Sequence, residues 1–300
     1  MSVINTNVSA MYSQNAMKTN ARAMNTAMEQ LSTGTRVNSA KDDAAGLAIG
    51  QNMTSQIKGL NQAVRNLNDG INMMQTAEGA MVEQSNMLQR MRELAVQSMN
   101  GTYSNTQRGY LDKEFQALTS QIGRIASDTK WNDQTLLDKT AGVTSGVFQY
   151  QAGQSSGQTI SVSIGKMTVS GLGLSVVASV AAVTASGSRV AVAAVTGQVA
   201  VGIATLSTAT NALNRISSAL ETINSQRAVI GAGINRMEYA GDNLVNISSN
   251  ATQSRSTIMD TDYAVATTQL SKTQIIQQAA TAMLAQANQQ PQSVMALLKG

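Results

Sequence analysis

The sequence predicts a mainly α-helical protein, an elongated antiparallel helical bundle or coiled coil with a small β-hairpin region. Between Met53 and Met99 the apolar residues step alternately by four and three positions, the spacing of a helix with one apolar seam. The 300 residues include one proline, Pro291, so long helices can run unbroken. Aromatic residues make up 3% of the chain and hydrophobic residues 42%, so Met, Leu, Ile, Val and Ala must do the packing. A helix over Met53–Met99 would be roughly 70 Å long and needs a partner elsewhere in the chain.

A second heptad run lies in residues 4–33, among many Asn, Thr, Ser and Gln residues. Its apolar positions are Met17, Ala21, Met24, Met28 and Leu31. Burying a large apolar side chain stabilises by about 1.5–3 kcal/mol, whereas ordering the backbone of one residue costs about 1–2 kcal/mol. Because it has so few large seam residues, we expect this run to be disordered in the monomer and helical only where partners cover its seam.

Gly34 is placed to end this helix, because glycine readily adopts the left-handed conformation that closes many helices. Asn38 or Ser39 could cap the next helix, with Asp42 and Asp43 in its first turn, where carboxylates are favourable. Paired carboxylates can also serve acid/base or metal chemistry. We interpret these two as part of a helix start or a connector.

The chain then leaves the long helix for a mixed region. Residues 100–105 have the composition of a turn, and the apolar spacing predicts a helix over 106–127. Residues 131–134 are expected to open a loop. Residues 159–164 alternate as a strand does, and 153–157 carry the glycines of a hairpin turn. We therefore expect a short β-hairpin here.

Residues 171–204 consist almost wholly of Gly, Ala, Val, Ser and Thr, and we interpret them as a short low-complexity excursion, strand-like or loop-like. Heptad spacing returns over 206–247, the expected partner of the Met53–Met99 seam. A last helix is expected over 262–288, with Pro291 ending it. A final apolar group follows at Val294, Leu297 and Leu298.

The composition excludes the enzymatic and metal-binding sites that depend on cysteine or histidine. With no cysteine and no histidine, the chain has no thiol nucleophile, disulfide, histidine base or usual zinc site. The glycines of Val229–Ile234 resemble a dinucleotide-binding motif, but Arg236 stands where the third glycine belongs and the pattern is helical. We expect no enzymatic activity, no cofactor and no bound metal.

Charge and hydropathy also exclude two classes of partner. Charged residues make up 13% of the chain, with a net charge of +4 and no dense run of Lys or Arg, so nucleic-acid binding is not expected. No window of about 20 residues is apolar throughout, so membrane insertion is not expected. The N-terminal residues lack the basic start and apolar block of a secretory signal peptide, so any export should use a route without a cleaved signal.

Several short motifs stand at the two ends of the chain. They are Val3–Asn7, Leu31–Gly34, Val37–Gly46, Asn68–Ile71, Thr76–Ala80, Leu88–Gln97, Asp260–Ala264, Gln277–Ala279 and Leu284–Gln289. Taken together they closely resemble bacterial flagellin, over about residues 1–140 and 205–298. The resemblance implies a subunit that self-assembles into the flagellar filament for swimming motility and is exported unfolded by the flagellar type III apparatus.

The resemblance also implies a division of the chain. Residues 1–45 and 255–300 would pair as the filament core. Residues 46–170, with long helices and a hairpin, would pair with 205–254 in an inner tube. Residues 171–204 would face outward, in a slim subunit with little or no independent outer domain. The implied partners are other subunits, hook-associated and cap proteins and an export chaperone.

The resemblance implies two groups of site residues. A surface read by the animal Toll-like flagellin receptor matches Gln89, Arg90, Leu94 and Glu114, which can equally be packing residues between subunits. The filament-core seam matches Met17, Met24, Met28, Leu31, Leu284, Val294, Leu297 and Leu298, and the last three of these correspond to C-terminal residues read by cytosolic sensors.

Three alternatives remain beside a filament subunit. A hook–filament junction (hook-associated) protein would share the flagellin-like ends, but the dense match over Leu88–Gln97 and Leu284–Gln289 favours flagellin. A flagellin with an enzymatic insertion would need metal ligands in 171–204, which hold no His, Cys, Asp or Glu. A generic coiled-coil binding module would not polymerise.

Overall fold

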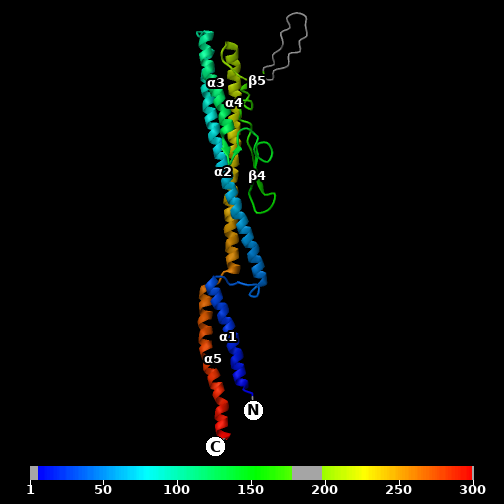
Figure 1. The fold of residues 1–300 in the computed structure, drawn as a ribbon, viewed down its shortest axis with the longest axis vertical. Coiled ribbons are helices and arrows are strands. Elements are labelled where there is room, and N and C mark those ends of the chain that lie inside the picture. Colours follow the sequence, from blue (N-terminus) through cyan, green and yellow to red (C-terminus); the bar gives the residue numbers. More distant parts are fainter. Residues whose placement is uncertain (1–5, 178–197, 299–300) are drawn as a thin grey trace. The chain divides into compact units, whose positions relative to one another are not determined.

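The structure, a computed structural model, describes residues 6–177 and 198–298 (Figure 1). Its helices are α1 (Val8–Thr33), α2 (Ala44–Ser98), α3 (Asn105–Asp128), α4 (Leu206–Met259) and α5 (Tyr263–Leu298). The chain forms two compact units, a terminal unit of Met1–Lys58 with Ile247–Gly300 and a larger unit of Gly59–Asn246. The fold is mainly helical with small hairpins, as expected. None of the described helices is long and apolar enough to cross a membrane.

In the terminal unit, α1 and α5 pack side by side in opposite directions (Figure 1). The side chain of Asn7 caps the start of α1 by accepting a hydrogen bond of 3.0 Å from the amide of Ala10. Gly34 ends α1 in the left-handed conformation, with φ of 73°, and its amide donates to the carbonyl of Gln30. The predicted end of this helix at Gly34 is confirmed.

The connector after α1 lies against the end of α4, where Thr35 forms an isolated bridge with Asp260 and the amide of Arg36 donates to the carbonyl of Met259. The helix start expected at Asn38 or Ser39 is wrong. Both amides of these residues donate to the carboxylate of Asp42, which fixes a turn there.

Helix α2 therefore begins later, at Ala44. The residue before it, Asp43, accepts a hydrogen bond of 2.8 Å from the amide of Gly46, as the side chain of an N-cap does. Asp42 thus stabilises the turn of the connector, and Asp43 caps the start of α2.

The core of the larger unit lies between α2, α3 and α4. Its buried residues on α2 are Leu60, Ala63, Leu67, Met73, Met74, Ala77, Met81, Leu88, Met91, Leu94 and Ala95. Those on α4 are Ala209, Ala212, Ile216, Ala219, Ile223, Ile230, Met237 and Leu244. Both sets keep the three-and-four spacing, so the predicted pairing of the two long seams is confirmed.

Among the described residues, three antiparallel two-stranded sheets accompany these helices. They are β1 (Lys130–Trp131) with β2 (Gln134–Thr135), β3 (Val147–Gln151) with β4 (Thr159–Ser163), and β5 (Ser175–Val177) with β6 (Gln198–Ala200). The loop expected at 131–134 is the first of these hairpins, because Asn132 and Asp133 take the positive φ values that a two-residue turn requires. The strand expected over 159–164 is β4, and the turn expected at 153–157 joins it to β3, so both predictions are confirmed.

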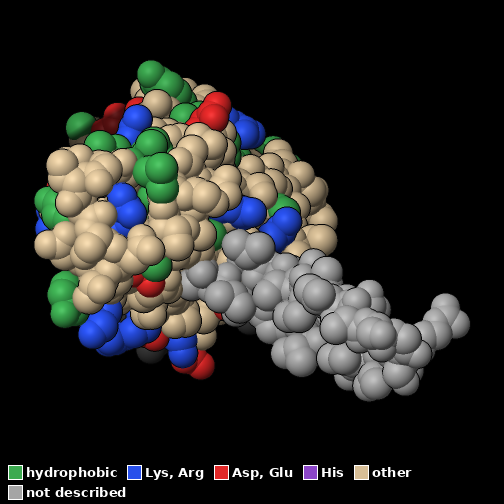
Figure 2. Space-filling view, turned by 90° about the horizontal axis from the view of Figure 1, so that it is seen from above, with side chains coloured by type: hydrophobic (Ala, Val, Ile, Leu, Met, Phe, Trp, Pro, Cys, Tyr) green, Lys and Arg blue, Asp and Glu red, His purple; other side chains and the backbone are tan. Residues whose placement is uncertain are grey.

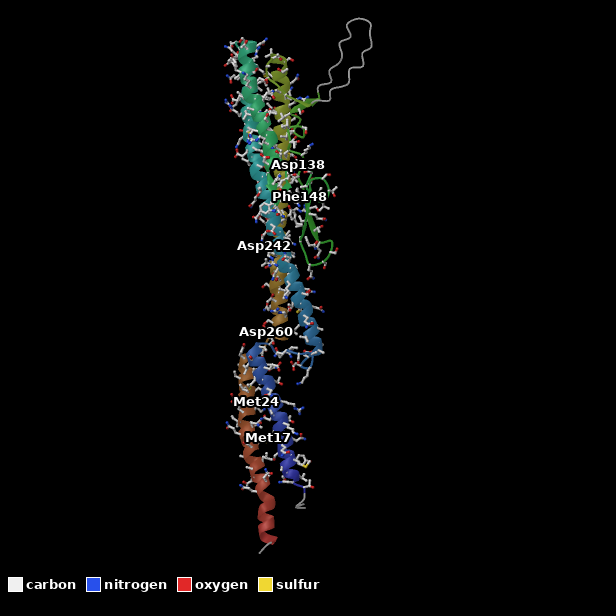
Figure 3. All side chains as sticks on the ribbon, viewed as in Figure 1. Met17, Met24, Asp138, Phe148, Asp242 and Asp260 are labelled. Atoms are coloured by element: carbon white, nitrogen blue, oxygen red, sulfur yellow. The ribbon has the colours of Figure 1, made fainter. Side chains whose placement is uncertain are left out.

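The β3–β4 hairpin packs on the long helices of the larger unit (Figure 1). Phe148, labelled in Figure 3, and Val162 are buried on its inner face. Gly233 of α4 allows this close approach, because a Cβ there would lie 2.8 Å from a methyl carbon of Val162. The glycine of the apparent dinucleotide motif thus serves packing.

Two further expectations concern residues 171–204 and the end of the last helix. In 171–204, β5 and β6 are strand-like, and most of the rest lies outside the described residues. Pro291 was expected to end the last helix, and this is wrong, because α5 continues to Leu298. Proline removes one backbone donor, but the residues after it are compatible with a helix and the turn continues.

Candidate assembly and recognition surfaces

The contact between α1 and α5 is made mostly by small and polar residues. On α1 a row of buried and half-buried positions runs through Ala10, Ser13, Met17, Asn20, Met24, Ala27 and Leu31, with Ala21, Ala23 and Gln30 half-buried beside it. On α5 the corresponding row is Ala266, Leu270, Thr273, Gln277, Ala280, Leu284 and Ala287. Each row repeats by alternate steps of three and four, which is the pattern of an antiparallel coiled-coil seam.

A polar layer lies in the middle of this seam. The side-chain amide of Asn20 donates hydrogen bonds to the carbonyl of Thr273 at 2.8 Å and to the side-chain oxygen of Gln277 at 3.2 Å. Near the end of the pair, the side-chain amide of Asn7 donates to the carbonyl of Ala287 at 2.8 Å. These bonds fix which residues of the two helices lie opposite each other. The apolar pattern of the sequence did not single out Asn7, Asn20, Thr273 or Gln277.

Among the described side chains of this pair, the buried apolar residues are alanines: Ala10, Ala27, Ala266 and Ala287. The expected seam residues Met17, Met24, Leu31 and Leu284 are only half-buried, and Figure 3 labels two of them on α1. Met28 is 52% exposed. Val294, Leu297 and Leu298 belong to α5, but their side chains lie outside the described residues.

Large apolar side chains also lie on the outer surface of the pair, among polar ones. Its exposed large apolar residues are Val8, Met11, Tyr12, Met28, Tyr263, Val265, Ile275, Ile276 and Met283. A groove of about 580 Å³ runs between the two helices on one side, lined by Tyr12, Ala16, Ala23 and Ile276 among polar residues. Exposed apolar surface on this scale is typical of a site that contacts another protein.

The second candidate surface lies on α2 and α3 of the larger unit. Arg90 bridges two carboxylates there, with its Nε 2.9 Å from Glu114 Oε1 and its Nη1 2.9 Å from Glu93 Oε2. Arg90 donates both of these charge-assisted hydrogen bonds, and the one to Glu114 contributes most to raising the pKa of Arg90 above its usual value. Arg90 is therefore held as a fixed positive charge on an exposed surface.

The four residues expected on this surface do not all lie on it. Arg90 and Glu114 are brought together, and Gln89 is exposed beside them. Leu94 is only 1% exposed and packs in the core, so it supports the surface from beneath. Glu93 was not singled out, although its position three residues after Arg90 on a helix is a signal for such a pair.

A groove of about 1070 Å³ adjoins this surface between α2 and α4. Gln89, Glu93 and Val96 line it from α2, and Glu221 and Arg227 line it from α4. Both acidic and basic side chains therefore line this groove. Among the described residues no group of three acidic side chains could hold a metal ion. In Figure 2 the Lys and Arg side chains of the described residues form separate small groups across the visible face.

Comparison with known proteins gives consistent matches over almost the whole chain. Residues 4–142 match the bacterial flagellin N-terminal helical region, and residues 213–298 match the bacterial flagellin C-terminal helical region. The flagellin of Halalkalibacterium halodurans is 40% identical over 297 residues, which cover 99% of this chain and 100% of that protein. Flagellin A of Vibrio cholerae is 35% identical over 379 residues, covering 99% of each chain.

A solved structure assigned to a flagellar hook-associated protein of Vibrio parahaemolyticus is also similar. It has a TM-score of 0.55 and 14% identity, and the match covers 72% of this chain and 99% of that one. At this identity the likeness concerns the fold alone.

Proposed function

Because this chain belongs to the bacterial flagellin family and is a structural subunit of the extracellular flagellar filament, we propose that its two ends form the filament core. In this proposal residues 1–45 pair with 255–300 in the core. Residues 46–170 and 205–254 form the inner tube around it, and 171–204 face outward. The observation that supports this most is the apolar outer surface of the α1–α5 pair, which nothing in the described part of the chain covers.

The same pair is proposed to be disordered in the monomer and helical in the filament. The buried apolar residues of its described part are alanines, which bury little surface, and its centre is polar. The free energy gained inside the pair is therefore small against about 1–2 kcal/mol for ordering each backbone residue. Contacts with neighbouring subunits would supply the difference, so ordering and assembly would occur together.

Limited proteolysis of dilute monomer tests this disorder. Cleavage is expected within about 1–45 and 255–300, while the larger unit stays intact because its core is large and closed. The same protease applied to filaments provides the comparison, and there the ends should resist. Ends that resist as well as the centre in dilute monomer would contradict the model.

Truncation tests the core. Deleting residues 285–300 removes the hydrogen bond between Asn7 and Ala287 and the last turns of α5. We expect the truncated protein to keep the thermal unfolding of its larger unit and to form no filaments by electron microscopy. Filaments of normal length from this variant would reject the assignment of the core to these residues.

The export route and the partner proteins of the subunit are also proposals. We propose export in an unfolded state by the flagellar type III apparatus, with an export chaperone for the subunit and hook-associated and cap proteins at the two ends of the filament. The absence of cysteine supports threading, since no disulfide can form on the way. Pull-down of the purified chain with each candidate, compared with the 285–300 deletion, tests these contacts.

Recognition by the animal Toll-like flagellin receptor is proposed for the surface around Arg90. The exposed Gln89 and the Arg90–Glu114 pair support it, since fixed polar groups on a rigid helix suit a specific interface. Leu94 would act indirectly, by positioning α2 from the core. These same residues can contact neighbouring subunits, so filaments and monomers should differ in receptor activation.

A hook–filament junction protein was the alternative expected for a chain with such ends. The likeness to a hook-associated protein is one of fold, whereas the full-length relatives at 35–40% identity are flagellins. Electron microscopy of the purified protein after seeding with salt separates the two. Long helical filaments are expected of a flagellin, and short or capped oligomers would indicate a junction protein.

A further inference from the structure

The methionine sulfurs are distributed unequally between the two units. The chain has 17 methionines and neither cysteine nor histidine, so methionine provides all of its sulfur. Among the described residues, the most exposed methionines are Met11 at 61%, Met28 at 52% and Met283 at 64%, and all three belong to the terminal pair. The buried ones belong to the larger unit: Met73, Met74, Met81, Met91, Met167 and Met237.

The three exposed methionines lie within the apolar outer surface of the pair. Met11 neighbours Tyr12 on α1, and Met283 follows Ile276 by two helical turns on α5. The bonds of Asn7 to Ala287 and Asn20 to Thr273 put Met11 and Met283 at the same level of the antiparallel pair. Two of the three sulfurs therefore lie on one short segment of this surface.

A thioether at such a position reacts with peroxides. One oxygen of hydrogen peroxide is transferred to the sulfur as its O–O bond breaks, giving methionine sulfoxide and one molecule of water, with sulfur oxidised and peroxide reduced. The product is polar and chiral, and methionine sulfoxide reductases reverse it. The change places a strong hydrogen-bond acceptor where an apolar contact is needed.

We propose that Met11, Met28 and Met283 are a reversible modification site, at which oxidation by a peroxide blocks addition of the subunit to the filament. This inference rests on the proposed role of the terminal pair in the filament core. A free subunit exposes the three sulfurs, and an assembled one covers them with its neighbours. Oxidation therefore acts on the subunit before it is added, while the methionines of the larger unit are protected throughout by their core.

The test compares oxidised and untreated protein in seeded filament elongation. Dilute full-length monomer is treated with hydrogen peroxide, the reagent is removed, and the sulfoxides are mapped by mass spectrometry. We expect sulfoxide at Met11, Met28 and Met283 well before Met74, Met81 or Met91, and elongation slowed at least tenfold. The same dose on assembled filaments should leave the three terminal sulfurs mostly unmodified.

Two variants locate the effect. The triple variant Met11→Leu, Met28→Leu and Met283→Leu keeps apolar side chains at these positions. After peroxide it should lose much less of its own untreated elongation rate than the wild type loses. The matched control Met53→Leu, Met87→Leu and Met99→Leu removes three half-buried sulfurs and should remain sensitive. A terminal triple variant that is slowed as much as the wild type would overturn the proposal.

A second readout covers the case in which the triple variant does not assemble. Treating oxidised wild-type protein with a methionine sulfoxide reductase should restore elongation, and no recovery would overturn the proposal. Normal elongation of fully oxidised protein would also overturn it while leaving the filament role intact. Failure of untreated wild type to elongate would instead contradict the filament-core role.

Discussion

The side-chain amide of Asn20 donates a hydrogen bond of 2.8 Å to the carbonyl oxygen of Thr273, 253 residues further along the chain. Both residues are buried in the seam of α1 and α5. A single polar residue in a coiled-coil seam lowers stability but fixes the register of the helices. This contact therefore aligns the two ends of the chain at the cost of some pairing strength.

Replacing Asn20 with aspartate should weaken assembly, because a carboxylate in the same space would face the carbonyl of Thr273 with no proton to donate. Leaving such a buried group without its partner costs about 1–3 kcal/mol, which corresponds to a rise of roughly 5- to 150-fold in critical concentration. The measurement is the monomer concentration left in equilibrium with filaments. Asn25→Asp, at an exposed position of α1, is the control and should change it little.

Gly70 and Gly79 on α2 should respond in opposite directions to alanine. A Cβ on Gly70 would lie 2.8 Å from ring carbons of Tyr150 and 3.1 Å from the sulfur of Met237, so Gly70→Ala should destabilise the larger unit by about 1–3 kcal/mol. A Cβ on Gly79 meets nothing within 4 Å, so Gly79→Ala should stabilise by up to about 1 kcal/mol. Urea unfolding of both variants measures this. Equal effects would show that the hairpin does not press on α2.

Acid should loosen the loop after β2 through Asp138 (Figure 3). Burial of this carboxyl acts to raise its pKa, but hydrogen bonds from the hydroxyl and amide of Thr140 and the hydroxyl of Thr135 outweigh burial and lower the pKa. Since the folded pKa lies below the usual 3.8, the carboxylate stabilises the fold above that pH, and the stability is lost as pH falls through the folded pKa.

The variant Asp138→Asn should consequently be less stable than the wild type at pH 7, and the difference should shrink as pH falls below 3.8 through the folded pKa. Thermal unfolding across this pH range measures the difference. Asp133→Asn, at a side chain 98% exposed, is the control and should follow the wild type throughout. A constant difference between wild type and Asp138→Asn at all pH values would exclude the carboxylate as the cause.

Arg90→Ala should weaken receptor activation by monomer at least tenfold while leaving the melting temperature nearly unchanged, because the ion pairs it breaks are exposed. Arg90→Lys should recover only part of the response, since lysine cannot bridge Glu93 and Glu114 in the same fork. Arg65→Ala, at another exposed arginine of α2, is the control. A response of Arg90→Ala equal to that of the control would reject this surface.

The helices and their pairing could be predicted because apolar spacing repeats over many turns, as it does along α2 and α4. The boundaries of helices and strands were harder to predict from the sequence. The start of α2 was expected too early, because the sequence does not reveal that Asp42 binds the amides of Asn38 and Ser39 and holds a turn. The turn at Asn132 and Asp133 was expected as a loop, although both residue types tolerate positive φ.

The recognition and assembly residues were less accessible to sequence reasoning. Glu114 came from family resemblance, and its partner Arg90 is 24 residues away on another helix, a distance that no local pattern spans. The polar layer at Asn20 and Gln277 was missed because a search for apolar residues passes over polar ones in a seam. Leu94 matched a family position, but only the fold reveals that it is covered.

The bond from Asn7 to Ala287 joins residues 280 positions apart, whereas the larger unit is one uninterrupted stretch, Gly59–Asn246. A chain that emerges end first can therefore complete the larger unit while its second terminal helix has still to arrive. The terminal pair, whose contacts have the greatest sequence separation, closes last. The order of residues along the chain thus delays the pairing of α1 with α5, and with it the assembly surface, until the larger unit has folded.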